Sequence, residues 1–345
     1  MELIECIEKL EKSKIKAGDG EKAGKYPLYT CSPKVNKFLD NYLYDTEAII
    51  LSTGGNPIIN YHKGRFSYST DCLAIKSNGK FENKYLYYYL ISKISDISKM
   101  FRGAGIKHLN KKELFQMNIN LIDKKEQKIV VKNLDMINNV IELKKKQLEE
   151  LNTIIKSQFV EMFKREKINK KGWLETTMGE HIRLLTDFSA NGSYKILDSK
   201  VIMYDEPNYA YMVRTIDLEN KEYKNKVKYI TKETYEFLSK SKVYPNDIIM
   251  NKIGSAGKVY IMPDLGIPVT LGRNAFLIRF NDNILPIYIY YLLTSDCGKK
   301  QIQKSIRGAV TKTITKDDVR KIKISVPPID LQNKFSEIVK QIDKQ

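Results

Sequence analysis

The sequence is poor in the residues from which metal sites and most catalytic centres are built. Three histidines occur among 345 residues, and they stand far apart as His62, His108 and His181. The four cysteines form no Cys-x-x-Cys pair and are scattered as Cys6, Cys31, Cys72 and Cys297. This spacing argues against a zinc site and against a disulfide framework. We therefore predict no metal site, and we expect the solitary histidines to be solvated or packed rather than catalytic.

Long apolar runs and nucleotide-binding motifs are also missing. No stretch of about 18 apolar residues is present, and a membrane-spanning helix requires one. The start, Met-Glu-Leu-Ile-Glu, is acidic and has no signal-peptide pattern, so we expect a cytoplasmic protein. Residues 254–258 look like part of a phosphate-binding loop, but the earlier glycine is missing and Val259 replaces the metal-binding hydroxyl. We find no catalytic constellation and predict no cofactor.

Positive charge is what the sequence has in excess. Its 59 Lys and Arg residues against 41 Asp and Glu residues leave a formal net charge of +18, and its apolar fraction of 42% is that of a folded protein. Some proteins carry basic charge for solubility. An excess of this size is more typical of a protein that binds a polyanion, because phosphate neutralisation supplies most of the sequence-independent affinity for DNA or RNA. We therefore expect a nucleic-acid partner.

A long helix is the element around which the chain is organised. Residues 123 to about 167 contain neither proline nor glycine. Their apolar residues alternate at steps of four and three: Val130, Leu134, Ile137, Ile141, Leu148, Leu151, Ile155 and Met162. This pattern is typical of a coiled coil. At 1.5 Å per residue the helix would be about 65 Å long, too long to bury its apolar stripe in one compact core. We predict a spacer that requires a partner helix.

The segments before and after this helix repeat one another. At a constant offset of 205 residues the sequence contains the matching pairs Arg102-Gly103-Ala104 and Arg307-Gly308-Ala309, Lys107 and Lys312, and Gln127 and Gln332. Both segments predict the order strand, glycine turn, strand, tyrosine-rich helix, Arg-Gly-Ala loop, strand, long helix. One structural unit is therefore used twice. The second long helix begins after Pro327-Pro328 and is much shorter than the first.

Residues that could contact nucleic acid gather in equivalent turns of the two units. In the first unit they are Ser52, Thr53, Gly54, Gly55, Asn56, Tyr68, Ser69, Thr70, Arg102, Gly103, Lys107 and His108. In the second unit they are Asn251, Lys252, Gly254, Ser255, Gly257, Lys258, Arg273, Asn274, Arg307, Gly308, Thr311, Lys312 and Thr313. Arg can form two hydrogen bonds with guanine and Asn with adenine, while Lys, Thr and backbone amides bind phosphates. We predict that these residues form the DNA-binding surface.

Each of these turns has a simpler explanation. Glycine permits a positive φ and lysine increases solubility, and neither role needs a ligand. The duplication of the turns in so basic a chain favours binding. Two tyrosine groups could stack on bases, namely Tyr85, Tyr87, Tyr88 and Tyr89, and Tyr288, Tyr290 and Tyr291. Because their spacing is helical, we expect them to pack against a core instead.

Three stretches carry a family resemblance. The first unit opens with Gly24-Lys25-Tyr26-Pro27-Leu28-Tyr29-Thr30-Cys31-Ser32, and in the second unit residues 237–248 lead into Met250-Asn251-Lys252-Ile253-Gly254. Both resemble the target recognition domains of specificity subunits of type I restriction–modification enzymes. Pro-Pro-Ile-Asp-Leu-Gln at 327–332 is similar to that family's entry into its spacer helices. The resemblance covers essentially the whole chain.

The resemblance implies an α+β fold in which two related mixed α/β target recognition domains are joined by a long antiparallel coiled-coil helical spacer. The expected boundaries are residues 1–122 for the first recognition domain, 123–170 for the central spacer helix, 171–327 for the second recognition domain and 328–345 for the short C-terminal spacer helix. The resemblance also implies a non-catalytic subunit of a restriction system. It would recognise a two-part site in double-stranded DNA, one half per domain.

The implied partners are methyltransferase (modification) subunits carried on the helices and a translocating nuclease (restriction) subunit in the full complex. The sequence departs from the family in one respect, because the second spacer helix is shorter than the first. We therefore expect uncovered apolar residues on the long helix to bind a partner, either a methyltransferase subunit or a second copy of this chain: Ile141, Leu148, Leu151 and Ile155.

Two other functions stay open at this point. The chain could itself be a restriction or modification enzyme, which would need a cofactor-binding loop that we do not find. It could also be a coiled-coil scaffold whose basic charge is incidental. Binding to duplex DNA across a salt series separates the scaffold from a DNA-binding protein, because a scaffold would show no steep salt dependence.

Overall fold

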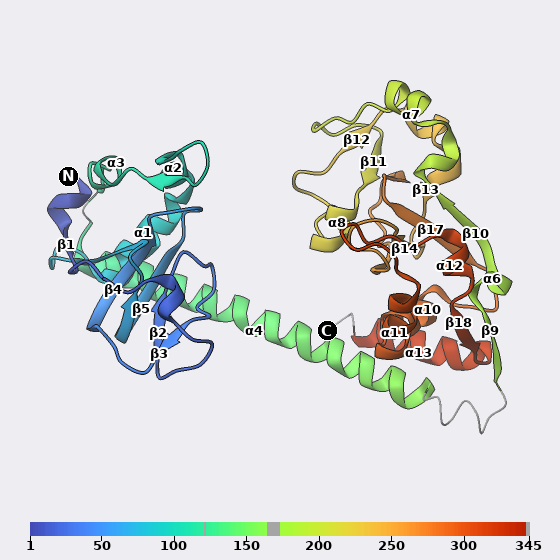
Figure 1. Ribbon diagram of the computed structural model, residues 1–345, viewed down its shortest axis with the longest axis horizontal. Coiled ribbons are helices and arrows are strands. Elements are labelled where there is room, and N and C mark those ends of the chain that lie inside the picture. The colour runs from blue at the N-terminus through green and yellow to red at the C-terminus, as the bar shows by residue number, and fades with distance from the viewer. Residues whose placement is uncertain (121, 164–172, 343–345) are drawn as a thin grey trace. The chain divides into compact units, whose positions relative to one another are not determined.

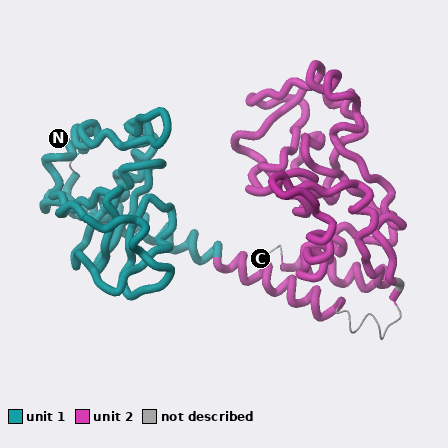
Figure 2. Tube along the Cα trace, viewed as in Figure 1, with its two compact units in different colours: residues 1–145 teal, residues 146–345 magenta. Residues whose placement is uncertain are grey.

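The computed structural model describes residues 1–120, 122–163 and 173–342 of the chain. The chain divides into two compact units, residues 1–145 (unit 1) and residues 146–345 (unit 2), as Figure 2 shows. Each unit combines sheets with helices around an apolar core of its own. The α+β fold class expected from the sequence is confirmed.

Unit 1 is built on one six-stranded sheet with the order β1-β6-β4-β5-β2-β3 (Figure 1). Its strands are β1 (Ile7–Lys9), β2 (Tyr26–Tyr29), β3 (Phe38–Leu39), β4 (Tyr44–Ser52), β5 (Ile59–Tyr68) and β6 (Cys72–Ser77). All neighbours are antiparallel except β2 and β5, which are parallel. Side chains alternate between the two faces of a strand. Ile49 and Leu51 of β4 accordingly enter one apolar cluster, and Ala48 and Ile50 enter another on the opposite face.

Helices and a short hairpin complete unit 1. They are η1 (Leu3–Cys6), η2 (Ala17–Asp19), α1 (Asn83–Ser92), α2 (Ile94–Lys99), β7 (Phe101–Arg102), β8 (His108–Leu109), α3 (Lys111–Phe115) and the first part of α4 (Lys124–Phe163). Helix α1 buries Leu86 and Leu90 completely, and Tyr85, Tyr87 and Tyr89 pack around the same cluster. The tyrosine-rich helix therefore packs against the core, as expected.

Unit 2 contains two four-stranded sheets, ordered β10-β17-β14-β15 and β12-β11-β16-β13, and the two-stranded pair β18-β9. The strands are β9 (Leu174–Thr177), β10 (Ile182–Asp187), β11 (Ala210–Val213), β12 (Tyr229–Ile230), β13 (Lys242–Val243), β14 (Ile248–Asn251), β15 (Val259–Ile261), β16 (Val269–Leu271), β17 (Ala275–Phe280) and β18 (Lys323–Val326). The helices are α6 (Met178–His181), η3 (Phe188–Asn191), α7 (Tyr194–Lys200), α8 (Thr215–Asn220), α9 (Lys232–Phe237), η4 (Ser239–Ser241), α10 (Pro286–Thr294), α11 (Asp296–Ser305), α12 (Lys316–Arg320) and α13 (Ile329–Ile342).

The two units share one topology. The order β10-β17-β14-β15 in unit 2 repeats β1-β6-β4-β5 in unit 1, with antiparallel pairing throughout. The parallel pair β11 and β16 repeats the parallel pair β2 and β5. In unit 1 the strand β5 runs without a break, whereas in unit 2 residues 262–268 separate β15 from β16. The one sheet of unit 1 therefore corresponds to two sheets in unit 2.

The long helix α4 contributes its first part to unit 1 and its last part to unit 2. It has 40 residues, and the expected residues 164–167 lie outside the described part of the chain. In unit 2, Phe159 and Phe163 lie with their ring centroids 5.3 and 5.6 Å from that of Phe335 on α13. Figure 1 shows α13 running back along this end of α4. The expected antiparallel pairing of the two spacer helices is therefore present in unit 2.

Candidate nucleic-acid interface

Three loops meet at one end of the sheet in unit 1. The amide of Gly55 donates to the carbonyl of Lys107 at 2.9 Å, and the amide of Leu109 donates to the carbonyl of Thr53 at 2.9 Å. The amide of Thr53 also donates to the carbonyl of Asp71 at 2.8 Å. The β4–β5 turn, the β5–β6 turn and the β7–β8 hairpin are thereby joined. We call residues 53–56, 70–71 and 102–108 the three-loop cluster of unit 1.

Unit 2 joins its loops through the same bonds. The amide of Gly254 donates to the carbonyl of Lys312 at 3.0 Å, and the amide of Ile314 donates to the carbonyl of Lys252 at 3.0 Å. The amide of Lys252 donates to the carbonyl of Asn274 at 2.8 Å. Residues 252–258, 273–274 and 307–313 form the three-loop cluster of unit 2. The predicted DNA-binding turns, which are distant in sequence, therefore lie together in each unit.

The Arg-Gly-Ala loop of each cluster is held by an ion pair. Arg102 pairs with Glu113 at 2.5 Å and Arg307 with Asp318 at 2.9 Å, again at the offset of 205 residues. The arginine side chains are 68% and 73% exposed, so most of their N–H donors remain accessible. A hydrogen bond from Thr315, followed by the Arg307 contact, lowers the pKa of the Asp318 carboxyl below its ordinary value. The pairs orient each arginine without burying it.

Glycine is required at the first turn of these loops. Gly103 has φ 143° and Gly308 has φ 97°, a region that side-chain-bearing residues rarely adopt. A Cβ at Gly103 would lie 2.7 Å from the carbonyl oxygen of Ile106, and one at Gly308 would lie 2.1 Å from that of Thr311. The glycine therefore sets the tight shape of both loops.

Most of the predicted DNA-binding residues lie at the surface. The exposed ones are Gly55, Asn56, Arg102, Gly103, Lys107, His108, Gly254, Lys258, Arg273, Asn274, Arg307, Gly308, Thr311 and Lys312. The half-buried ones are Thr53, Gly54, Thr70, Lys252, Ser255, Gly257 and Thr313. The buried ones are Ser52, Tyr68, Ser69 and Asn251.

The buried residues support the loops from behind. The Ser52 hydroxyl donates to the carbonyl of Asn56 at 2.6 Å and accepts from the amide of Ile58 at 2.9 Å, which closes the β4–β5 turn. The side-chain amide of Asn251, 1% exposed, donates to Glu219 at 3.2 Å, and its carbonyl oxygen has no hydrogen-bond partner in the described chain. In this conformation these side chains shape the surface rather than form it.

Lys252 forms an ion pair with a buried carboxylate. Its ammonium lies 2.9 Å from Asp187, which also pairs with Lys316 at 3.3 Å and is 8% exposed. Burial opposes the charged form of Asp187, yet the hydrogen bond from Lys252 and the charges of both lysines lower the pKa of its carboxyl. Lys252 thus anchors its loop to the end of β10. One carboxylate serves two ammonium groups here, so the three side chains together keep one net positive charge.

Arg273 lies in a setting that only unit 2 possesses. Its guanidinium pairs with Asp198 at 3.1 Å and lies over the rings of Phe188 and Tyr194, 5.6 and 5.3 Å from their centroids. The Arg273 side chain is still 46% exposed, and that of Asp198 is 61% exposed. The sequence patterns did not single out Tyr194 and Asp198, because these residues lie on α7, which has no α-helical counterpart between β1 and β2 of unit 1.

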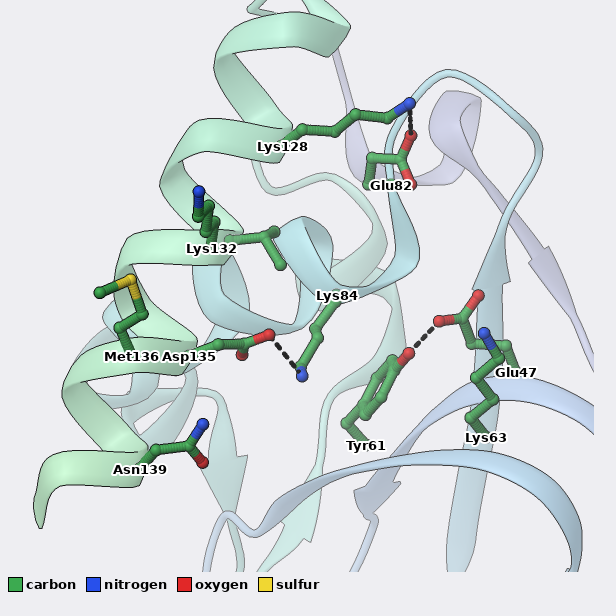
Figure 3. A pocket seen from close by; sticks show the side chains of 11 residues that line it. Glu47, Tyr61, Lys63, Glu82, Lys84, Lys128, Lys132, Asp135, Met136 and Asn139 are labelled. Atoms are coloured by element: carbon green, nitrogen blue, oxygen red, sulfur yellow. Dashed lines mark hydrogen bonds and ion pairs between the residues drawn. The ribbon is translucent and has the colours of Figure 1, made fainter. Parts of the chain in front are cut away.

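Unit 1 also contains a basic pocket beside α4, with a cavity of about 580 Å³ (Figure 3). Lysines enter it from three elements: Lys63 from β5, Lys84 from α1, and Lys128 and Lys132 from α4. Asp135 pairs with Lys84 at 2.7 Å, and Glu82 lies 3.9 Å from Lys128. Glu47, the β4 residue opposite Lys63, also lines the pocket, so four lysines face three carboxylates. Within the described ranges no ion pair is formed by Lys63 or Lys132. These two ammonium groups can bind an anion such as a phosphate.

The predicted partner-binding residues of α4 differ in accessibility. Ile141 is 44% exposed and Leu148 is 60% exposed, whereas Leu151 is half-buried. Ile155 is 2% exposed and belongs to the core of unit 2. Further apolar side chains in the middle of the helix are exposed by more than half: Met136, Ile137, Val140 and Leu143. The middle of α4 therefore presents apolar surface, while its last turns are covered from within the chain.

Within residues 1–120, 122–163 and 173–342, no helix is long and apolar enough to cross a membrane. In the same ranges no group of three or more His, Cys, Asp and Glu side chains is arranged to hold a metal ion.

One solved structure resembles the whole chain. It is the crystal structure of the S subunit of a type I restriction–modification system from M. genitalium, with a TM-score of 0.62, and the match covers 100% of this chain and 88% of that one. Sequence identity is 15%, so the likeness concerns the fold alone.

Several named proteins are similar in sequence, and two of them illustrate the range of the matches. The type I restriction enzyme MjaVIII specificity subunit of Methanocaldococcus jannaschii is 24% identical over 318 residues, which cover 87% of this chain and 72% of that protein. The type I restriction enzyme EcoDI specificity subunit of Escherichia coli is 28% identical over 161 residues. That second match covers 45% of this chain and only 34% of the Escherichia coli protein.

A family model matches nearly the whole chain in two parts. Residues 1–153 and residues 182–345 both match the type I restriction modification DNA specificity domain. Each matched part contains one three-loop cluster, so the repeat found in the sequence and in the topology is also a repeat of this domain. The chain belongs to the family of type I restriction modification DNA specificity domains.

Proposed function

We propose that this chain is a non-catalytic subunit that recognises a two-part site in double-stranded DNA, with one half-site bound by each three-loop cluster. The observation that carries the proposal is the duplication of the cluster itself. Both units join three loops through the same backbone hydrogen bonds and display an exposed, ion-paired arginine on a glycine turn. Exposed Arg and Asn side chains are suited to hydrogen bonds with base edges. The backbone amides beside them are suited to phosphates.

The two clusters differ where specificity would require it. Unit 1 displays Asn56 and His108, whereas unit 2 displays Asn274 and the Arg273 group held by α7. A shared backbone with different side chains fits two half-sites of different sequence. Because α4 is one uninterrupted helix shared by both units, we infer that unrecognised base pairs separate the halves.

Positioning on the duplex would be electrostatic. Lys63 and Lys132 of the basic pocket, with their unpaired ammonium groups, fit phosphate contacts that hold the duplex without selecting its sequence. A net charge of +18 supports the same partner.

The proposal includes the binding of other subunits to α4. The exposed apolar surface in the middle of α4 fits the docking of methyltransferase subunits, and a second copy of this chain is the alternative occupant. In the full complex a translocating nuclease subunit would join them. The chain itself would then provide recognition, and its partners the chemistry.

A salt titration of duplex binding tests the proposal. The complex of this chain with its methyltransferase should bind duplex DNA with log K falling linearly against log salt, at about 0.9 per phosphate neutralised. The variant Lys63→Gln with Lys132→Gln should lower that slope by about two and weaken binding to all sequences alike. Lys224→Gln with Lys226→Gln, on exposed lysines outside the pocket and the loops, is the matched control. Binding that is indifferent to salt would contradict the proposal and favour a scaffold.

A further inference from the structure

The most exposed apolar side chains of the molecule are concentrated at the three-loop clusters. Over the described residues the three highest values for large apolar side chains are 97% for Val310, 73% for Ile106 and 72% for Tyr194. Val310 and Ile106 lie at the tips of the two Arg-Gly-Ala loops, and Tyr194 lies against Arg273. Burial of a valine or isoleucine side chain stabilises a fold, and these two exposed side chains forgo that contribution. The stability of the fold therefore does not explain why apolar residues occupy these two positions.

The loops that carry these tips are held rigidly. Each closes on an antiparallel pairing, Arg102 with His108 in unit 1 and Arg307 with Thr313 in unit 2, and each is joined to the neighbouring turn by the Lys107 or Lys312 carbonyl. The tip side chains are also stiff, because a β-branched residue has few χ1 rotamers. The tip thus projects a small apolar surface in a fixed direction.

The surroundings of the tips identify the occupant. Two basic side chains flank each tip: Arg102 and Lys107 in unit 1, and Arg307 and Lys312 in unit 2, all exposed. Such a basic surface complements a polyanion. We therefore expect the apolar tip to contact an apolar group that the polyanion carries. The 5-methyl group of thymine is such a group, and it lies in the major groove, which admits a two-stranded β-ribbon. The β7–β8 hairpin is a ribbon of this kind.

Resting on the proposed function, we propose that Val310 and Ile106 are specificity-determining residues that contact the 5-methyl group of a thymine, one in each half-site. The two tips are not in identical register. At the offset of 205 residues Val310 matches Gly105, and Ile106 matches Thr311. The apolar contact is therefore displaced by one residue between the units, which fits recognition of a different base position in each half.

The test replaces thymine by uracil, which lacks the methyl group. The probe is a duplex with the methylation motif of the intact complex, in which each thymine in turn is exchanged for uracil. The wild-type complex should lose about fourfold in affinity at one thymine per half-site, since about 0.8 kcal/mol per methyl-sized group corresponds to that factor. Val310→Ser should bind the thymine and uracil duplexes of its half-site equally, and Ile106→Ser should do so for the other half.

Two control variants test whether the effect is specific to the methyl groups of the tip residues. Ile267→Ser alters another exposed β-branched residue of unit 2, in the loop at the opposite end of β15, and should discriminate as the wild type does. Val310→Thr retains one of the two methyl groups and should discriminate to an intermediate degree. Since both tips are exposed, the variants should keep the melting temperature of the wild type.

The outcomes separate this inference from the proposed function. Equal binding of thymine and uracil duplexes by the wild type, a motif without thymine, or unchanged discrimination by Val310→Ser would overturn the inference while DNA recognition stands. Equal binding of the motif duplex and a scrambled duplex would overturn both.

Discussion

At the scale of single residues, the candidate surface consists of exposed side chains held in place by buried ones. Asn251 and Ser52 are buried and shape their turns, whereas Arg273 and Arg307 are accessible although each is ion-paired. The Arg273–Asp198 pair is exposed on both sides, and such pairs add about 0–1 kcal/mol to stability. The fold's stability therefore depends little on the orientation of Arg273, whereas Arg307 pairs with the buried Asp318.

Replacing Arg273 should separate binding from stability. Arg273→Ala removes a 46% exposed side chain, so the melting temperature should change little. Recognition at one position of one half-site should be relaxed, with a loss of about 1–3 kcal/mol at that base pair. Binding of the complex to duplexes mutated one base pair at a time measures this.

Arg320→Ala is the matched control, because Arg320 is 47% exposed, pairs with the exposed Asp317, and lies outside the three-loop cluster. It should leave specificity intact. Equal weakening by Arg273→Ala on every sequence would instead identify Arg273 as a phosphate contact.

At the scale of elements, two buried glutamines fix the start of each spacer helix to its unit. Gln127 accepts from the amide of Glu82 at 2.8 Å and donates to the carbonyl of Ile122 at 2.9 Å. Gln332 accepts from the amide of Leu285 at 2.8 Å and donates to the carbonyls of Asn283 and Pro327, each at 2.9 Å. Both side chains are fully buried. Each ties the first turn of its long helix to the residue preceding the tyrosine-rich helix.

Removing one glutamine should loosen one junction. Gln332→Leu leaves the Leu285 amide and two carbonyls without their partner. At about 1–3 kcal/mol for each of these buried groups, unit 2 should be destabilised by roughly 3 kcal/mol or more. Hydrogen exchange should accelerate over residues 283–290. Gln303→Leu, on the exposed face of α11, should not have this effect. Unchanged protection in Gln332→Leu would show that the helix is held by its apolar contacts alone.

Local sequence patterns predict some of these features. The tyrosine-rich helix α10, the course of α4 as far as Phe163 and the match of Gln127 with Gln332 follow from periodicity or from the repeat. The same patterns do not predict the burial of Asn251 or the contacts of Arg273 with Asp198 and Tyr194. Those depend on chain segments tens of residues away, because α7 and α8 of unit 2 lie between strands whose counterparts in unit 1 are connected by segments without an α-helix. Non-local contacts leave no periodic signal.

At the scale of the whole molecule, the middle of α4 is the apolar surface that folding leaves uncovered. Met136, Ile137, Val140, Leu143 and Leu148 are all more than half exposed. Apolar surface of this extent on a helix usually marks a protein interface. Ile155 is already used within unit 2, so a partner would bind the middle of the helix rather than its end.

Polar replacement of this surface should abolish assembly without unfolding the chain. Ile141→Ser with Leu148→Ser alters exposed positions, so the melting temperature should be retained, while co-purification with the methyltransferase subunit, or self-association, should be lost. Ile216→Ser with Ile202→Ser, on exposed isoleucines outside α4, is the control. A wild-type chain that stays monomeric at tens of micromolar and binds no methyltransferase would contradict an interface here.

The central claim is that each unit recognises its own half of one DNA site, and genome-wide mapping of methylated bases tests it most directly. Cells expressing the wild-type chain with its methyltransferase should show one motif of two short sequences separated by unrecognised base pairs. Cells expressing Arg102→Ala should show a motif relaxed in one half, and cells expressing Arg307→Ala a motif relaxed in the other. A single contiguous motif, or relaxation of the same half by both variants, would contradict the account.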